Sequence, residues 1–267
     1  MQPLQVRDGA FVAPYAGAKR STYQFYLERQ RLGQVRVNAA RVGFDLGLTG
    51  TAGELRLGPY ASDVRTQPDF GVVTPLFPHQ EFQEAGVQLT GITDRLDSPA
   101  FARSGWLAAF DVHTARLRGD EEGVSARAQL TLRGVKSFDK NTFAANFEWG
   151  DKLSDDLAVY DAFKLGGPMR LSGLFLDQLT GTRYRLATLS YYRQYTALPA
   201  QIGRGVYLGM SLEAARVDDA LMKNPWDWIS GGSVYWAADT VLGALYLGYG
   251  YSSLGQQTGY LMIGSRF

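Results

Sequence analysis

The chain contains no cysteine among its 267 residues, and histidine occurs only at His79 and His113. The lack of cysteine excludes disulfide bonds and thiolate metal centres. Lysine plus arginine number 27 and aspartate plus glutamate 26, so the net charge lies near zero and gives no electrostatic footprint for a nucleic acid. We therefore expect no metal, no cofactor and no nucleic-acid partner.

Long apolar runs and catalytic motifs are missing as well. No stretch of 18 apolar residues exists, which excludes a transmembrane helix. Neither the G-x-S-x-G elbow of serine hydrolases nor a glycine-rich phosphate loop occurs. Asp111 lies two residues before His113 and shares its face on a strand, which favours a hydrogen-bonded pair in a polar interior over a catalytic pair. The sequence predicts that this chain is not an enzyme.

The sequence does contain a recurrent two-residue alternation, as in a β-strand whose successive side chains point to opposite faces. Transmembrane β-strands need about 9–11 residues, whereas strands of soluble sandwiches average about 5–6. The alternating segments have the longer length, so we predict an all-β, antiparallel transmembrane β-barrel. In the clearest segment, an apolar face alternates with a polar or small one: Val206, Leu208, Met210 and Leu212 against Tyr207, Gly209, Ser211 and Glu213.

About twelve strands are predicted, and residues 1–267 are expected to form one barrel domain. Short links such as 137–139 and 240–242 contrast with long ones at 64–81, 152–181 and 218–230, as in barrels with short turns on one rim and long loops on the other. The strands are expected near residues 9–27 (one strand or a hairpin), 34–48, 52–63, 82–93, 105–118, 122–136, 140–151, 182–195, 205–217, 231–239, 243–252 and 258–267.

Aromatic residues are predicted to form girdles where the barrel meets the membrane interfaces, because amphipathic rings favour that level. A carbohydrate platform is the alternative for the neighbouring Trp226 and Trp228. The girdle candidates are Trp106, Trp149, Trp226, Trp228, Trp236, Tyr249 and Tyr251.

The carboxy-terminal segment 257–267 alternates in the same way and stops on an aromatic residue. It resembles the closing strand and assembly signal of bacterial outer-membrane β-barrels. That resemblance implies an integral protein of the bacterial outer membrane, in contact with its lipid and lipopolysaccharide. It also implies that the barrel-assembly machinery recognises the last strand through Tyr260, Leu261, Ile263 and Phe267.

Two links resemble signatures of the bacterial surface antigen superfamily of BamA/TamA-like barrels. The link 93–105 is similar to the family's aspartate-rich, proline-containing periplasmic turn. The second link, at residues 163–174 of the long loop 152–181, is similar to the family's sixth extracellular loop. In the family, that loop has a glycine pair followed by a valine-arginine-glycine-aromatic run. In this chain Ser172 stands where the arginine usually does. The motif consists of Gly166, Gly167, Arg170, Leu171, Ser172 and Gly173.

The leucine-serine-glycine version resembles the patatin-like phospholipase autotransporter branch, in which a lipase domain and a periplasmic domain precede the barrel. In the family the loop folds into the barrel and its arginine meets an acidic residue. We expect Arg170 to form that ion pair with Glu213, which lies on the polar face of its strand. The alternative is that Glu213 simply lines a wet interior.

The resemblance also bears on completeness. Family barrels have sixteen strands, and residues 1–8 are not a signal peptide. We therefore expect this chain to be the carboxy-terminal piece of a longer protein. About four strands would then be missing, so the first and last strands should remain unpaired edges.

Three functions remain open. The first is the anchor and translocator of a patatin-like phospholipase. The second is an assembly or secretion barrel. The third is a passive porin, which the glycine-pair loop disfavours because it suggests a plugged interior. The oligomeric state is left open.

Overall fold

The computed structural model describes residues 4–5, 9–27, 30–71, 79–155, 161–199, 201–218 and 227–264. Thirteen strands form one antiparallel sheet in chain order, and β9 (Phe163–Leu165) pairs with β10 (Leu179–Gly181) in a separate hairpin. No helix in this described part is long and apolar enough to cross a membrane. The strands of the large sheet are β1 (Leu4–Gln5), β2 (Ala10–Leu27), β3 (Gln30–Gly50), β4 (Gly53–Gly71), β5 (Gln80–Asp94), β6 (Ser104–Gly119), β7 (Gly123–Phe138), β8 (Asn141–Lys152), β11 (Arg183–Ala197), β12 (Gly203–Val217), β13 (Ile229–Thr240), β14 (Gly243–Ser252) and β15 (Gln257–Ile263).

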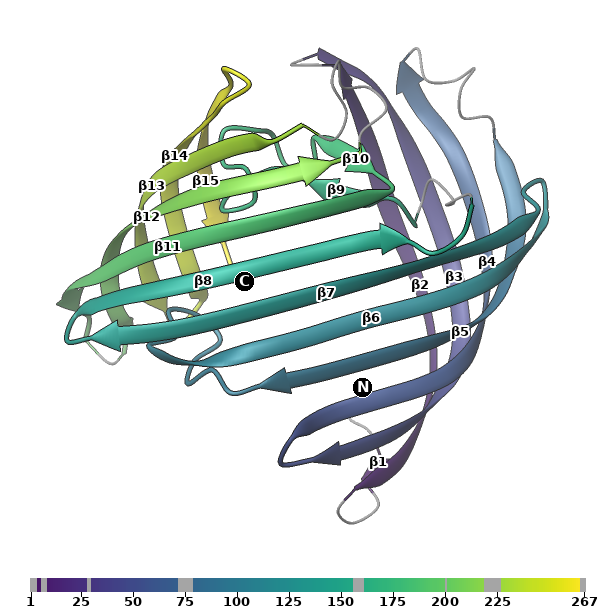
Figure 1. The fold of residues 1–267 in the computed structure, drawn as a ribbon, viewed down its shortest axis with the longest axis horizontal. Coiled ribbons are helices and arrows are strands. Elements are labelled where there is room, and N and C mark those ends of the chain that lie inside the picture. Colours follow the sequence, from purple (N-terminus) through teal and green to yellow (C-terminus); the bar gives the residue numbers. More distant parts are fainter. Residues whose placement is uncertain are drawn as a thin grey trace.

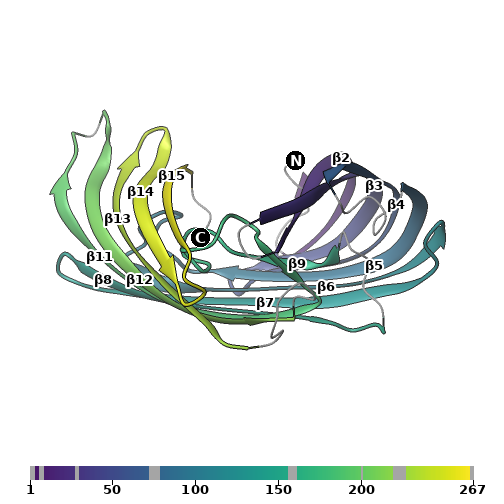
Figure 2. The same ribbon diagram turned by 90° about the horizontal axis from the view of Figure 1, so that it is seen from above.

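The sheet curls into an open trough (Figures 1 and 2). β2–β4 rise on one side, β11–β15 rise on the other, and the hairpin of β9 lies within the concave face. Each long strand pairs with its neighbour in sequence, apart from the inserted hairpin between β8 and β11. Within the described residues no ladder joins β15 to β1 or β2, so the wall is an open arc with an edge at each end. The predicted all-β, antiparallel architecture is confirmed.

The strands present opposite side chains to the two faces of the wall, as the alternation predicts. On β12, Leu208, Met210 and Leu212 are 46%, 48% and 67% exposed, whereas Ser211 and Glu213 on the concave face are 2% and 3% exposed. This pattern confirms the predicted register. The convex face is an apolar band. Apart from the two-residue β1 and the seven-residue β15, the strands of the large sheet have 10 to 21 residues.

Aromatic residues of the convex face lie near both rims. Trp106 and Trp236 lie close to the rim of short turns, while Trp228 lies at the rim of long loops, and all three are half-exposed or more. Trp226 lies outside the described residues. The rings therefore mark two levels on the wall, as expected for an interfacial girdle.

The last strand follows its predicted phase over the residues described. Leu261 and Ile263 are exposed on the convex face, and Tyr260 faces the concave side, where its hydroxyl donates to Ser233 Oγ at 3.2 Å. Phe267 lies outside the described residues, so its part in the predicted assembly signal stays a prediction.

One predicted boundary is wrong. The link expected from residue 64 begins only after β4 ends at Gly71. Asp63 and Arg65 suggest a loop, but both are exposed strand residues that form a weak surface ion pair at 3.6 Å. Between them Val64 is fully buried and packs against Val35 and Phe82, which keeps the strand in the sheet. Residues 10–27 form one strand, not a hairpin.

A charge introduced on the convex face tests whether this face contacts lipid. We expect Leu212→Arg, near the middle of β12, to lower the unfolding free energy in a bilayer by about 2–4 kcal/mol. The same substitution at an exposed leucine of a water-facing sheet would change the unfolding free energy by at most about 0.5 kcal/mol. Denaturant titration in lipid vesicles measures the difference. Leu242→Arg, in the short turn and 87% exposed, is the matched control and should have little effect.

Candidate functional site

The loop between β8 and β11 begins its return into the trough at the glycine pair. Gly166 and Gly167 have φ values of 123° and 99°, a region that side chains other than glycine rarely adopt. A Cβ on Gly166 would lie 2.5 Å from the carbonyl oxygen of Phe175. The glycine pair therefore permits the chain to reverse direction, so that β9 before the loop motif and β10 after it remain hydrogen-bonded to each other.

Two non-glycine residues of the motif also have left-handed backbones. Met169 has φ 58° and Leu171 has φ 76°, each costing about 1–3 kcal/mol. Tertiary contacts hold both in place. The Met169 amide donates to Ser172 Oγ at 2.8 Å, its carbonyl accepts from Thr188 Oγ1 at 3.1 Å, and Leu171 is fully buried against the inner wall. Backbone strain of this kind persists only where the surrounding structure fixes the conformation of the segment.

Glu213 is the acidic partner of the motif, but it binds Ser172 and not Arg170. The Ser172 amide and Oγ both donate to the Glu213 carboxylate at 2.6 Å, and Ser211 Oγ donates at 2.5 Å. Ser172 is fully buried and Glu213 is 3% exposed. Serine therefore reaches the acid from the motif position at which the sequence resemblance led us to compare it with an arginine.

Arg170 has a different partner, so the predicted Arg170–Glu213 ion pair is wrong. Its Nη2 donates to Glu148 Oε2 at 2.8 Å, on β8. The same carboxylate accepts from the Tyr184 hydroxyl at 3.1 Å and from Asn146 Nδ2 at 3.2 Å. Because Leu171 turns into the apolar cluster, the side chains on either side of it reach different strands.

The next residue lies directly on the wall. A Cβ on Gly173 would overlap the backbone of Tyr251 and Ser252, so only glycine permits this approach. Thr258 Oγ1 donates to the Gly173 carbonyl at 2.9 Å, and Gln178 Nε2 donates to Gln256 Oε1 at 3.0 Å. These contacts tie the loop to β14, to β15 and to the link between them.

The opposite side of the loop reaches the other end of the sheet. Lys164 Nζ donates to the Thr22 carbonyl at 3.0 Å and lies 3.4 Å from the centre of the Tyr23 ring. Phe175 stacks on Tyr26 with ring centres 6.0 Å apart. The loop therefore contacts both β2 and the β12–β15 side, and it bridges the open trough.

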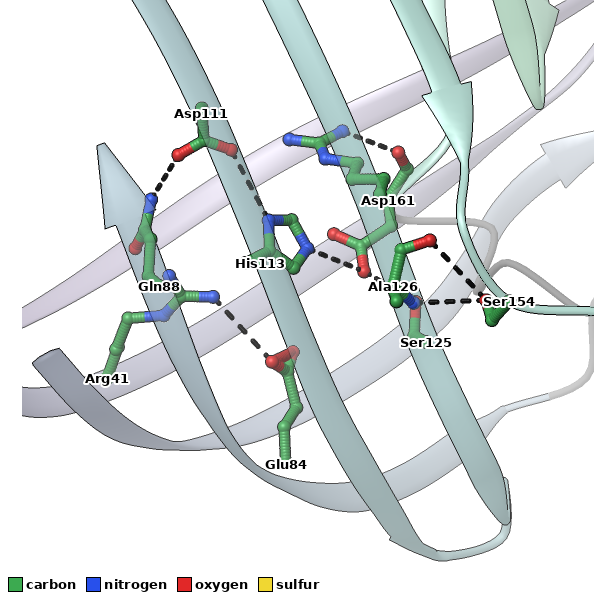
Figure 3. Close-up of polar contacts among 10 residues, drawn as sticks. Arg41, Glu84, Gln88, Asp111, His113, Ser125, Ala126, Ser154 and Asp161 are labelled. Atoms are coloured by element: carbon green, nitrogen blue, oxygen red, sulfur yellow. Dashed lines mark hydrogen bonds and ion pairs between the residues drawn. The ribbon is translucent and has the colours of Figure 1, made fainter. Parts of the chain in front are cut away.

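A third anchor joins the start of the loop to the wall at His113 (Figure 3). His113 lies between two carboxylates, with Nδ1 3.4 Å from Asp111 and Nε2 3.2 Å from Asp161. The predicted Asp111–His113 pair is confirmed. Asp161 comes from the loop and was not foreseen. It also accepts from Ser125 Oγ at 2.8 Å, and its carbonyl accepts from Arg127 Nη1 at 2.5 Å.

These hydrogen bonds hold the start of the loop against the wall, and their direction differs from that in a catalytic triad. In a serine hydrolase the histidine accepts the serine proton, and the carboxylate orients the histidine. Here Ser125 donates to Asp161, so the carboxylate separates the hydroxyl from His113. In the described part of the chain no group of three or more His, Cys, Asp or Glu residues could hold a metal ion.

The turn 95–103, at the rim of short turns, also packs into the concave face. Slight burial disfavours the charged form of Asp97, but hydrogen bonds from Arg103 and Ser104 outweigh this and lower its pKa. The turn thus shaped inserts Phe101, which has φ 49° and is 6% exposed, into the concave face. Its ring stacks on Tyr207 with centres 4.2 Å apart, and on Tyr246 at 5.2 Å.

Loop and turn belong to one apolar cluster, because Met169 and Phe101 both pack with Tyr192 and Tyr235. A cavity of about 300 Å³ remains beside it and is lined by Arg133, Asn146, Glu148 and Arg170 among others. The concave face thus carries an aromatic seal, a polar cavity and a hydrogen-bonded loop.

The sequence contained signals for some of the missed residues. Glu148 lies in the polar phase of its strand, as Glu213 does, so both were candidates for a buried acid. Position-by-position matching of the loop motif would have placed Ser172, not Arg170, against Glu213. No local signal pointed to Phe101 or Asp161, because their partners lie 34 or more residues away.

Comparisons with known proteins give the fold. No family model matches the chain, and no curated protein sequence matches it. The structure is similar to that of BamA from Haemophilus ducreyi lacking POTRA domains 1–3, with a TM-score of 0.69 and 11% identity, over 97% of this chain and 59% of that chain. It is also similar to CdiB from Acinetobacter baumannii, with a TM-score of 0.57 and 12% identity, over 85% of this chain and 42% of that one.

A double-mutant cycle tests the partner of Arg170. We expect Arg170→Ala and Glu148→Ala to show a coupling energy of about 1–3 kcal/mol, because the two side chains share an ion pair. The pair Arg170→Ala and Glu213→Ala should be additive within about 0.5 kcal/mol. Unfolding free energies of the single and double variants provide both values. The reverse order of couplings would contradict the arrangement described.

Replacing Phe101 tests the aromatic seal. Phe101→Ala should destabilise the protein by about 3–5 kcal/mol, since the buried ring leaves a cavity among tyrosines. Phe138→Ala is the control, because Phe138 is the last residue of β7, beside the next short turn of the same rim, and its ring is 62% exposed. Equal effects of the two substitutions in chemical denaturation would show that the Phe101 ring is not packed as described.

Proposed function

We propose that this chain forms the wall of an outer-membrane β-barrel of the bacterial surface antigen superfamily that acts in the assembly or secretion of proteins. The loop that returns into the trough carries the proposal. Leu171, Ser172 and Leu174 are fully buried, and the Ser172 amide and hydroxyl bind Glu213. A chain built to pass small solutes would leave this face wet, so the contacts argue against a passive porin.

The fold supports the proposed class. BamA and CdiB have the same wall over most of this chain, although the chain spans only 59% and 42% of their lengths. The apolar convex face and its two aromatic levels suit an integral protein in contact with lipid and lipopolysaccharide. In this proposal the barrel-assembly machinery binds the last strand, and the rim of short turns faces the periplasm.

The open edges also need partners in a membrane. Lipid offers no hydrogen bonds to the unpaired backbone of β2 and β15. We propose that about four further strands close the wall, giving the sixteen expected for the superfamily.

A second candidate function is the anchor and translocator of a patatin-like phospholipase. The observation that favours it is the leucine-serine-glycine form of the motif, Leu171 to Gly173, in which serine binds the buried acid. The lipase would belong to a separate domain, because Ser125 and His113 are not arranged for catalysis.

Depletion of the protein in its own bacterium distinguishes these functions. An assembly barrel should lower many outer-membrane β-barrels, a secretion barrel one or a few exported proteins, and a lipase anchor only surface phospholipase activity. Quantitative proteomics of outer membranes and culture medium, with a lipase assay, measures each result. An unchanged outer membrane, secretome and lipase activity would refute all three.

Complementation tests the loop within the same experiment. We expect Glu213→Ala to insert but not to restore function, because hydrogen bonds to a charged group contribute about 1.5–3 kcal/mol each and the loop loses its acceptor. Glu54→Ala is the matched control. It removes an acid that pairs with Arg56 at the short-turn rim, and it should complement fully.

A further inference from the structure

A groove lies on the convex face at the rim of short turns. It has a volume of about 620 Å³ and extends from the short-turn end of β11 toward the middle of β12 and β13. Its apolar part consists of Leu208, Met210 and Val234, which are all about half-exposed. Its polar part includes Lys140 and Arg193. The groove is separate from the loop and the aromatic seal, which lie on the concave face.

A β-bulge shapes this groove. The register between β11 and β12 shifts between Gln194 and Thr196, which leaves Tyr195 as the extra residue. Tyr195 projects outward, is 71% exposed, and meets the Trp236 ring edge-on with centres 6.1 Å apart. Leu208 pairs with Arg193 on one side and with Trp236 on the other. The bulge thus places the Tyr195 and Trp236 rings beside the apolar side chains of the groove.

The positive charges of the groove are not neutralised by the protein. Within the described residues neither Lys140 nor Arg193 forms an ion pair, and no acidic residue lines the groove. Other exposed arginines differ, since Arg183 pairs with Asp218 at 3.2 Å and Arg204 with Asp239 at 3.8 Å. Two unpaired cations above an apolar floor are complementary to a molecule with an anionic head and hydrocarbon tails.

We propose that this groove binds one anionic glycerophospholipid, and the proposal rests on the membrane location proposed above. Arg193 binds the phosphate through its planar guanidinium, and Lys140 adds a second charge. The acyl chains lie on Leu208, Met210 and Val234. The Tyr191 hydroxyl donates to Asn141 Oδ1 at 2.7 Å, which fixes its ring at the edge of the site. Tyr195 and Trp236 lie at headgroup level.

The position in the wall selects the lipid. In the proposed orientation the short-turn rim faces the periplasm, so the groove meets the phospholipid leaflet. The lipopolysaccharide leaflet meets the opposite rim. The site therefore selects a glycerophospholipid with a net negative headgroup over a zwitterionic one of equal chain length.

Native mass spectrometry of the 267-residue chain tests the proposal. The protein is extracted in a non-ionic detergent and offered equimolar phosphatidylglycerol and phosphatidylcholine with identical acyl chains. We expect preferential retention of one phosphatidylglycerol. Arg193→Gln and Lys140→Gln should each lower this preference about fivefold, the factor that corresponds to about 1 kcal/mol per basic residue near an anionic membrane surface. Arg193→Lys should keep most of the preference.

Arg185→Gln is the matched control, because Arg185 is also exposed on β11 but does not line the groove. It should bind as the unaltered chain does, and circular dichroism checks that every variant keeps its strands. Equal retention of the two lipids, or equal losses in Arg185→Gln and Arg193→Gln, would overturn the lipid site. Failure of the full-length protein, with the strands that close its wall, to enter vesicles would instead overturn the proposed membrane function.

Discussion

The buried carboxylate of Glu213 is the constraint on which the interior depends. A loop inside a strand wall brings amides and hydroxyls that can no longer bind water, and each needs a partner. Glu213 satisfies the amide and the hydroxyl of Ser172, together with Ser211. This places Gly173 against the wall and directs Leu171 and Leu174 into the apolar cluster.

The other anchors divide the loop into sections with separate partners. Asp161 binds β6 and β7, Arg170 binds β8, and Lys164 reaches β2. The contacts lie on strands from both sides of the trough, so the loop links parts of the sheet that share no backbone ladder (Figure 2). Below it, Met169 meets the Phe101 cluster, so the loop and the turn from opposite rims support each other.

The outer face of the fold was largely predictable, because a two-residue period is a local property of the chain. It gave the twelve long strands and the outward positions of Leu208, Met210 and Leu212. The partners on the concave face were harder to predict, because they depend on register across neighbouring strands. Glu148 lies opposite Thr131 and Leu186, whereas Glu213 lies opposite Thr188 and Gly231. Alternation shows that both acids face inward, but not which one Arg170 reaches.

The two faces of the wall nevertheless constrain the strand register together. On β12 the residues that hold the loop, Ser211 and Glu213, alternate with the residues of the apolar band, Met210 and Leu212. A slip of one residue would turn Glu213 to the convex face and Leu212 to the loop. The loop contacts and the convex band therefore favour the same register, and neither face can shift without the other. The bulge at Tyr195 disturbs this phase only near the end of β11, past the last loop contact, so it can shape the outer groove without moving the interior anchors.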